Sequence, residues 1–139
     1  MLGLLPVHSH ALVIGYQEIL PAARETFPFF SVGALFRSWE WETMEVDLHD
    51  PRGTALDLNK PIQFRRDFDL VFDIGTLEHI ADSQQAIENY LGALRADGLL
   101  FLLTPVKGYF DHGFHVFSPE YLRSTLTLNG CAIIDEFFL

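Results

Sequence analysis

Cysteine is almost absent from this 139-residue chain, which has Cys131 alone. One thiol cannot form an internal disulfide and no Cys-rich metal spacing is present, so the sequence predicts a reducing compartment. Long apolar runs are also missing, because the run at residues 99–103 is far too short to cross a bilayer. No Lys or Arg precedes the apolar residues 2–5, unlike in a signal peptide. We therefore expect a cytoplasmic protein without a membrane span.

Basic residues are scarce, with nine Lys and Arg against nineteen Asp and Glu and a net charge of −10. A surface of this charge repels phosphate backbones, so nucleic acid is not an expected partner. A cationic ligand is compatible with it, although a solvated acidic surface is the commoner reason for such a balance. The hydrophobic fraction of 49% is sufficient for one core, so residues 1–139 are expected to form a single domain.

Short apolar or alternating runs, several followed by Gly or Asp, are typical of buried strands that end in turns. The run at residues 99–103 is uninterrupted, which favours a central strand covered on both faces. The predicted strands are residues 11–14, 44–48, 54–58, 68–72, 99–103 and, closing the chain, 131–139.

Helix signals alternate with these runs. A short helix is expected within residues 18–27. Asp82 and Gln85 resemble a capping box, and Gly98 stands where the glycine after a helix is expected. Ser118 precedes a proline and predicts a further helix start, with Gly130 at its end. The alternation predicts an α/β fold with a doubly wound, mostly parallel, Rossmann-like sheet that binds ligands beyond the carboxyl ends of its strands.

Two motifs then carry a specific resemblance. They are Gly75-Thr76-Leu77-Glu78-His79 and His112-Gly113-Phe114 followed by Phe117-Ser118-Pro119-Glu120. With the strand before the first motif, they resemble the class I S-adenosylmethionine-dependent methyltransferases, and the pair of motifs is similar to a bacterial subgroup of them. The likeness covers roughly residues 11–135. It implies methyl transfer from S-adenosylmethionine to a small-molecule acceptor, or to one linked to a glycan or lipid.

The resemblance also implies a cofactor site at the strand ends. Gly15 and Gln17 would lie against the methionine part, Asp47 would bind the ribose, Asp57 and Leu58 would face the adenine, and the backbone of Asp73, Ile74 and Gly75 would contact the methionine amino group. A carboxylate can accept both ribose hydroxyls, and glycine lets the backbone approach a ligand. A turn or cap role is the alternative for both Asp47 and Asp57.

The first loop departs from the family, because Gly15-Tyr16-Gln17-Glu18 replaces the usual glycine-rich sequence. This loop argues against a dinucleotide, whose pyrophosphate needs bare backbone amides at a helix start. S-adenosylmethionine has no phosphate, so a side chain such as Gln17 can hydrogen-bond its carboxylate or amine.

His112 and His115 are the catalytic candidates, because they follow Pro105 in the loop expected near the methyl group. Histidine side chains exchange protons near neutral pH and suit a general base for a hydroxyl or amine acceptor. The alternative is that both histidines cap or face solvent while phenylalanines pack the loop. Asp111, His112 and His115 could also bind a metal, but their spacing is loose and we predict none. Cys131 is expected in the core.

Two further expectations concern function and assembly. A non-catalytic, methyltransferase-like module that binds a protein partner is the alternative function. Class I methyltransferases have one more antiparallel strand beside the fifth, and the sequence up to Leu139 shows no counterpart. An uncovered sheet edge favours association. We therefore expect the last strand to move beside the fifth or two chains to form a homodimer that buries Phe137 and Phe138.

Overall fold

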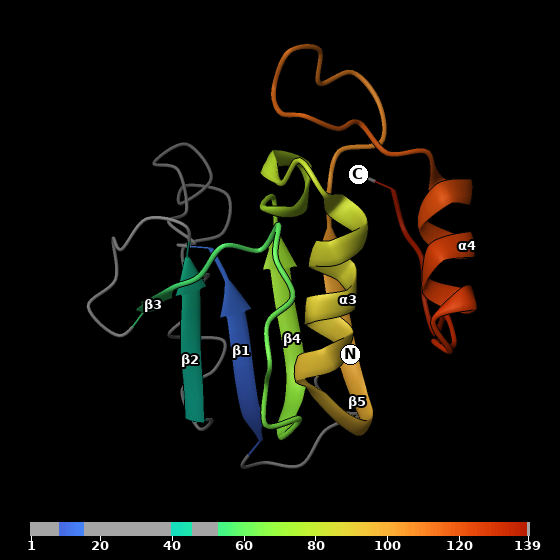
Figure 1. The fold of residues 1–139 in the computed structure, drawn as a ribbon. Helices are drawn as coiled ribbons and strands as arrows, with labels where there is room; N and C mark the ends of the chain where they lie inside the picture. The colour runs from blue at the N-terminus through green and yellow to red at the C-terminus, as the bar shows by residue number, and fades with distance from the viewer. Residues whose placement is uncertain (1–8, 16–39, 46–52, 139) are drawn as a thin grey trace, which may run out of the picture.

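A parallel β-sheet forms the centre of the chain (Figure 1). The computed structural model describes residues 9–15, 40–45 and 53–138. Within them the strand order is β3-β2-β1-β4-β5, and every neighbouring pair is parallel. The strands are β1 (His10–Ile14), β2 (Glu40–Glu45), β3 (Gly53–Ala55), β4 (Phe68–Ile74) and β5 (Leu94–Leu103). The predicted α/β class with a parallel sheet is confirmed.

Strands β1 and β4 are buried on both faces of the sheet. Leu12, Ile14 and Val71 belong to the core cluster that also contains residues of helix α3 (Ser83–Ala93). Val13 and Phe72 belong to a second cluster, and both are buried as well. Alternate side chains point to opposite faces of a sheet, so a strand covered on both faces needs an unbroken apolar run. The strands predicted at residues 11–14 and 68–72 are therefore confirmed.

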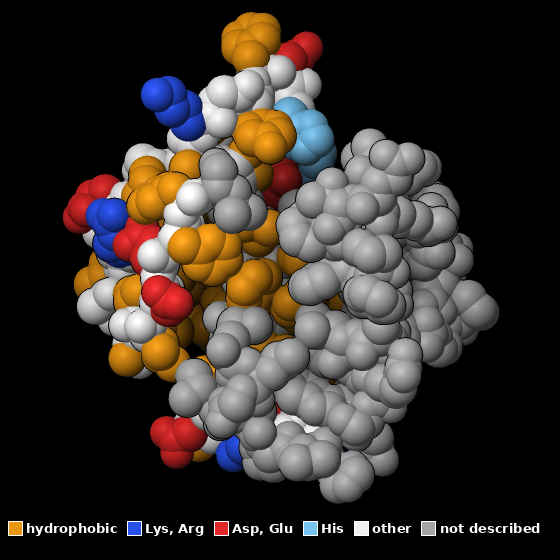
Figure 2. All heavy atoms as spheres, turned by 180° about the vertical axis from the view of Figure 1, so that it is seen from behind, with side chains coloured by type: hydrophobic (Ala, Val, Ile, Leu, Met, Phe, Trp, Pro, Cys, Tyr) orange, Lys and Arg blue, Asp and Glu red, His pale blue; other side chains and the backbone are white. Residues whose placement is uncertain are grey.

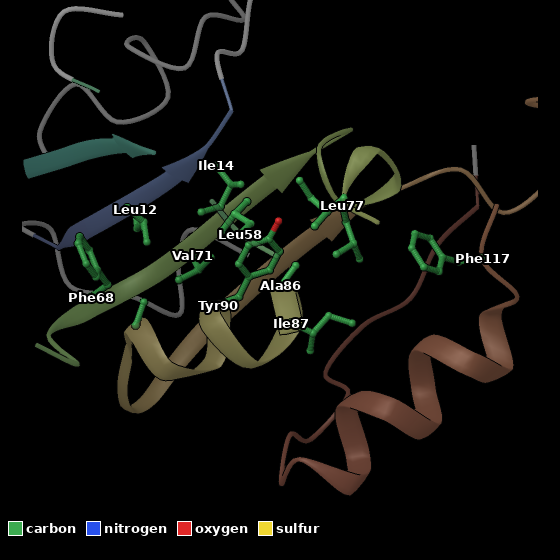
Figure 3. Close-up of a cluster of buried hydrophobic side chains, with 12 residues drawn as sticks. Leu12, Ile14, Leu58, Phe68, Val71, Leu77, Ala86, Ile87, Tyr90 and Phe117 are labelled. Atoms are coloured by element: carbon green, nitrogen blue, oxygen red, sulfur yellow. The ribbon is translucent and has the colours of Figure 1, made fainter. Parts of the chain in front are cut away.

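Helix α3 covers one face of β4 and β5 (Figure 1). Its start is the predicted one, because the carboxylate of Asp82 accepts a hydrogen bond from the Gln85 N–H at 3.0 Å. The second half of the expected capping box does not form, since the Asp82 N–H donates to Oδ1 of Asn59 at 3.0 Å rather than to the Gln85 side chain. Figure 3 shows Tyr90 of this helix pointing toward the sheet, and both Tyr90 and Ile87 belong to the buried core.

Gly98 does not end this helix, contrary to the sequence prediction. Helix α3 ends at Ala93 and β5 begins at once at Leu94. The left-handed residue is Asp97, with φ 62°, and Gly98 lies within β5. A Cβ atom on Gly98 would lie 3.1 Å from the Arg95 carbonyl oxygen and 3.2 Å from the Phe68 carbonyl oxygen, so glycine relieves crowding within β5 and against β4 rather than ending a helix.

Strand β5 is not central, which corrects a second prediction. It stands at the end of the strand order, and residues 99–103 are only half-buried. Residues 131–138 form no strand, and Cys131 is half-buried beyond a helix end rather than inside a strand. Phe137 is 51% exposed, with its ring centroid 6.4 Å from that of Phe101 in β5. The expectation that a last strand lies beside the fifth is therefore wrong for the described residues. A homodimer through this edge stays a prediction.

The predicted last helix is confirmed as α4 (Pro119–Leu128). The Ser118 hydroxyl accepts a hydrogen bond from the Tyr121 N–H at 3.1 Å, and Gly130 follows with φ 85°. Its side chains Leu122 and Leu126 pack against the edge of the core. No helix found in the described parts of the chain has the length and apolar character of a membrane span.

The second and third strands differ from their predicted bounds. Strand β2 begins at Glu40, earlier than the predicted residue 44, while residues 46–48 lie outside the described residues. Strand β3 ends at Ala55, before the predicted residue 58. The expected helix at residues 18–27 lies outside the described residues, as do Gln17 and Asp47.

Candidate functional site

The carboxyl ends of β1 and β4 meet at one point of the sheet, because Ile14 pairs with Asp73. Each strand is followed directly by a glycine with a left-handed backbone: Gly15 has φ 73° and Gly75 has φ 77°. The Thr76 hydroxyl donates to the Ile14 carbonyl at 3.2 Å and links the two turns. The chain leaves β1 toward β2 on one side, whereas β4 lies on the other, and parallel α/β sheets bind ligands at such a switch of direction.

Asp73 fixes the turn after β4 from inside the protein. Its carboxylate is fully buried and accepts hydrogen bonds from the Thr76 N–H at 2.9 Å and the Leu77 N–H at 3.1 Å. The Tyr90 hydroxyl donates a third, at 3.0 Å. Burial raises the pKa of Asp73 to about 7, although these hydrogen bonds oppose the rise. The Asp73 side chain therefore positions the turn, and only the backbone of this segment can face a ligand.

Glu78 lies at the centre of a polar cluster above β4, in the short helix η2 (Leu77–His79). Its side chain is only 2% exposed, and its Oε2 accepts a hydrogen bond from the Thr104 hydroxyl at 3.0 Å. Its Oε1 lies 3.9 Å from Nε2 of His112. The His112 ring stands edge-on to that of His79, with 5.0 Å between centroids. A buried carboxylate and two imidazoles therefore converge at this end of the sheet.

The loop of residues 105–117 carries His112 and is fastened onto η2. The His115 N–H donates to the Glu78 carbonyl at 3.1 Å, and the Phe117 N–H donates to the Pro105 carbonyl at 3.0 Å. A Cβ atom on Gly113 would lie 2.7 Å from the Glu78 carbonyl oxygen, so any larger residue there must displace the loop. The loop thus has a fixed attachment beside the polar cluster.

Three aromatic side chains of this loop are exposed, whereas Phe117 is buried. Phe110 is 97% exposed, and Tyr109 and Phe114 are also exposed. The Tyr109 ring centroid lies 5.6 Å from that of His112. Figure 2 shows hydrophobic side chains next to histidine side chains at the upper edge of the rear face. An apolar surface therefore adjoins the polar cluster.

The two catalytic candidates have different environments. His112 lies in the polar cluster, whereas Nε2 of His115 is 3.0 Å from the Ala81 carbonyl and its ring stacks on Phe117. His115 has the contacts of a capping residue, which was the alternative reading of both histidines. Among the residues that the structure describes, His112 groups with Glu78 and His79 rather than with Asp111 and His115.

The predicted adenine contacts, Asp57 and Leu58, are not among the side chains of the polar cluster. Asp57 is exposed and accepts a hydrogen bond from the Asn59 N–H at 3.0 Å, as in an Asx turn. Its pKa is lowered to about 2, chiefly by the hydrogen bond from Lys60. The Leu58 side chain is buried in the core, so only its backbone could contact a ligand. Ile74 is half-buried at the end of β4, beside Gly75.

Sequence reasoning missed Glu78, His79 and Thr104 as parts of this cluster. Glu78 and His79 were visible as an acid and an imidazole directly after a strand, but a role in starting a helix explained them equally well. Thr104 gave no signal, because its contact with Glu78 depends on the pairing of β4 with β5. The chain matches no known protein family, and no curated protein is similar enough to count as a relative.

Proposed function

We propose that the chain is an S-adenosylmethionine-dependent methyltransferase with a Rossmann-like, doubly wound fold. The observation that carries the proposal is the pair of left-handed glycines, Gly15 and Gly75, at the ends of adjacent strands where the sheet changes direction. Glycine there lets a ligand approach the backbone, as the methionine part of this cofactor requires. The strand order β3-β2-β1-β4-β5 supports the same proposal, because it is the order of a Rossmann half with its neighbouring strands.

Methyl transfer requires the protein mainly to align the reacting groups. The methyl group moves from the sulfonium to an oxygen or nitrogen of the acceptor, that atom loses a proton, and the sulfur becomes the neutral thioether of S-adenosylhomocysteine. Holding nucleophile, carbon and sulfur in line lowers the barrier most. In this proposal the backbone of residues 73–75 holds the methionine amino group, Gln17 its other polar end, and Asp47 the ribose.

The acceptor would bind at the polar cluster. His112 contacts it there, either as the base that takes its proton or as an anchor for its oxygen. The exposed rings of Tyr109, Phe110 and Phe114 lie in the same loop and can stack on the apolar face of a sugar or cover a lipid chain. These contacts support a small-molecule, glycan-linked or lipid-linked acceptor.

Calorimetric titration tests the cofactor. We expect S-adenosylmethionine and S-adenosylhomocysteine to bind and NAD not to bind. Asp47→Ala should weaken S-adenosylmethionine by about 1–3 kcal/mol, because the ribose hydroxyls lose their acceptor. No heat of binding at about 1 mM ligand would contradict the proposal. It would favour a non-catalytic module that binds a protein partner.

A second test addresses His112 once an acceptor is known. His112→Ala should lower turnover roughly 100-fold and leave cofactor affinity unchanged, because the imidazole acts on the acceptor. Wild-type kinetics in this variant would remove both roles proposed for His112.

A further inference from the structure

The geometry around Glu78 points to a binding site for a divalent transition-metal ion, with Glu78, His79 and His112 as its ligands. The three potential ligand atoms, one from each side chain, lie within 4.8 Å of one another. The methyltransfer chemistry proposed above needs no metal ion, so metal binding would be an additional property of the polar cluster.

The Glu78 carboxylate has one oxygen that accepts no hydrogen bond from the described residues. Its carboxylate is 2% exposed, and Thr104 satisfies Oε2. Within the described part of the chain, no group donates a hydrogen bond to Oε1, since the 3.9 Å to His112 Nε2 is too long for one. Among the described residues, the buried side-chain oxygen without a partner is Oδ1 of Asp67, so Oε1 of Glu78 is still open to solvent and a cation can reach it. A cation there would pair with a carboxylate that is otherwise almost fully buried.

The two imidazole rings can reach a common metal ion with small movements. Both His79 and His112 are exposed, so their rings can turn without disturbing the core. Ligands about 2.1 Å from one tetrahedral ion lie about 3.4 Å apart. The present spacing therefore needs shifts of only about 1 Å, which rotation of exposed rings can provide. Glu78, by contrast, is held in place through Thr104.

The donor set indicates the kind of ion. Two imidazoles and one carboxylate suit zinc or iron(II), whereas magnesium and calcium prefer oxygen ligands alone. Three protein ligands leave coordination positions open for water or a ligand oxygen. If the proposed methyltransferase function also holds, the ion selects the anchoring role for His112, because the acceptor oxygen would then bind through the metal. That consequence alone rests on the proposed function.

Zinc competition against a fluorescent chelator tests the site on the full chain without any cofactor. Metal-free wild type should bind one zinc per chain, and magnesium should not displace it. His79→Ala and His112→Ala should each weaken zinc roughly 100-fold. His115→Ala is the matched control, because this histidine lies in the same loop but contacts Ala81. It should bind zinc as wild type does.

Several results of the zinc assay would contradict the proposed site. Failure of wild type to take up zinc at about 100 μM overturns the site. So does wild-type affinity in the His79 or His112 variant, or an equal loss in His115→Ala. Circular dichroism establishes whether each variant is folded, and His112→Gln replaces any alanine variant that is not. Because the zinc assay contains no S-adenosylmethionine, the result of the assay is independent of the methyltransferase proposal.

Discussion

The region under helix α3 and the region beyond strand β5 differ in how completely their side chains are packed. Under α3, Ile87 and Tyr90 are buried, and Asn89 binds three backbone groups of the neighbouring segment. Beyond β5, α4 has no buried residue, and Leu128 is 87% exposed. The first region thus stabilises the fold, whereas the second presents apolar side chains to solvent. The candidate functional loop of residues 105–117 joins the two.

The largest expected effect on stability comes from Asp73, in the packed region under α3. Burial raises its pKa from 3.8 to about 7, so the folded protein keeps a proton that the unfolded chain loses near pH 4. Its contribution to stability is therefore full below about pH 4 and is lost as the pH rises to about 7, on the order of 4 kcal/mol. Urea unfolding across this range should show a steeper fall for wild type than for Asp73→Asn. Parallel pH profiles would show that Asp73 does not titrate there.

Shortening one apolar side chain in each region should give the next largest difference in the free energy of unfolding. Ile87→Ala removes a fully buried side chain and should lower the free energy of unfolding by about 3 kcal/mol. Leu128→Ala, at the exposed end of α4, should change it by less than about 0.5 kcal/mol. Chemical denaturation measures both. Equal effects would mean that the region beyond β5 is as well packed as the region under α3.

Asn89 tests the polar part of the packed region. Its Nδ2 donates to the carbonyls of Leu58 and Lys60, and its Oδ1 accepts from the Ile62 N–H. Asn89→Ala should cost about 2–3 kcal/mol, because buried backbone groups lose their partners. Asn129→Ala is the matched control, since its side chain makes one exposed hydrogen bond to Thr125. A similar loss of thermal stability in both variants would contradict the comparison.

The smallest expected effect is at the start of α4. Ser118→Ala removes the acceptor for the Tyr121 N–H and should cost about 1 kcal/mol, and Ser118→Asp should restore most of it. Thermal unfolding of the three proteins provides the measurement. A loss in Ser118→Ala that Asp does not reverse would mean that the hydroxyl acts other than as a helix cap.

The sequence was informative where structure is decided locally. The apolar runs of β1 and β4 and the Asp82 and Ser118 caps each follow from a few adjacent residues, and all were predicted correctly. The position of β5 at the sheet edge depends on what pairs with it, which no local pattern reports. Gly98 shows the same limit, because it lies within β5, where a Cβ atom would crowd Leu94, Arg95 and the Phe68 carbonyl across the sheet.

The candidate site likewise has features that adjacent residues determine and features that depend on distant ones. Gly15 and Gly75 were predictable because a glycine directly after an apolar strand marks a turn, and both have left-handed backbones. The different contacts of His112 and His115 were not predictable, although only two residues lie between them. One faces Glu78 and the other the Ala81 carbonyl, and both partners come from a segment more than thirty residues earlier in the chain.

The central claim is that the turns after β1 and β4 bind S-adenosylmethionine, and a pair of glycine variants tests it most directly. Gly75→Ala and Gly130→Ala strain the backbone alike, with φ 77° and 85°, but only Gly75 lies at the proposed site. Calorimetry should show wild-type affinity for Gly130→Ala and at least about 10-fold weaker binding for Gly75→Ala. Equal affinity in the two variants, or no binding to wild type, would contradict the claim.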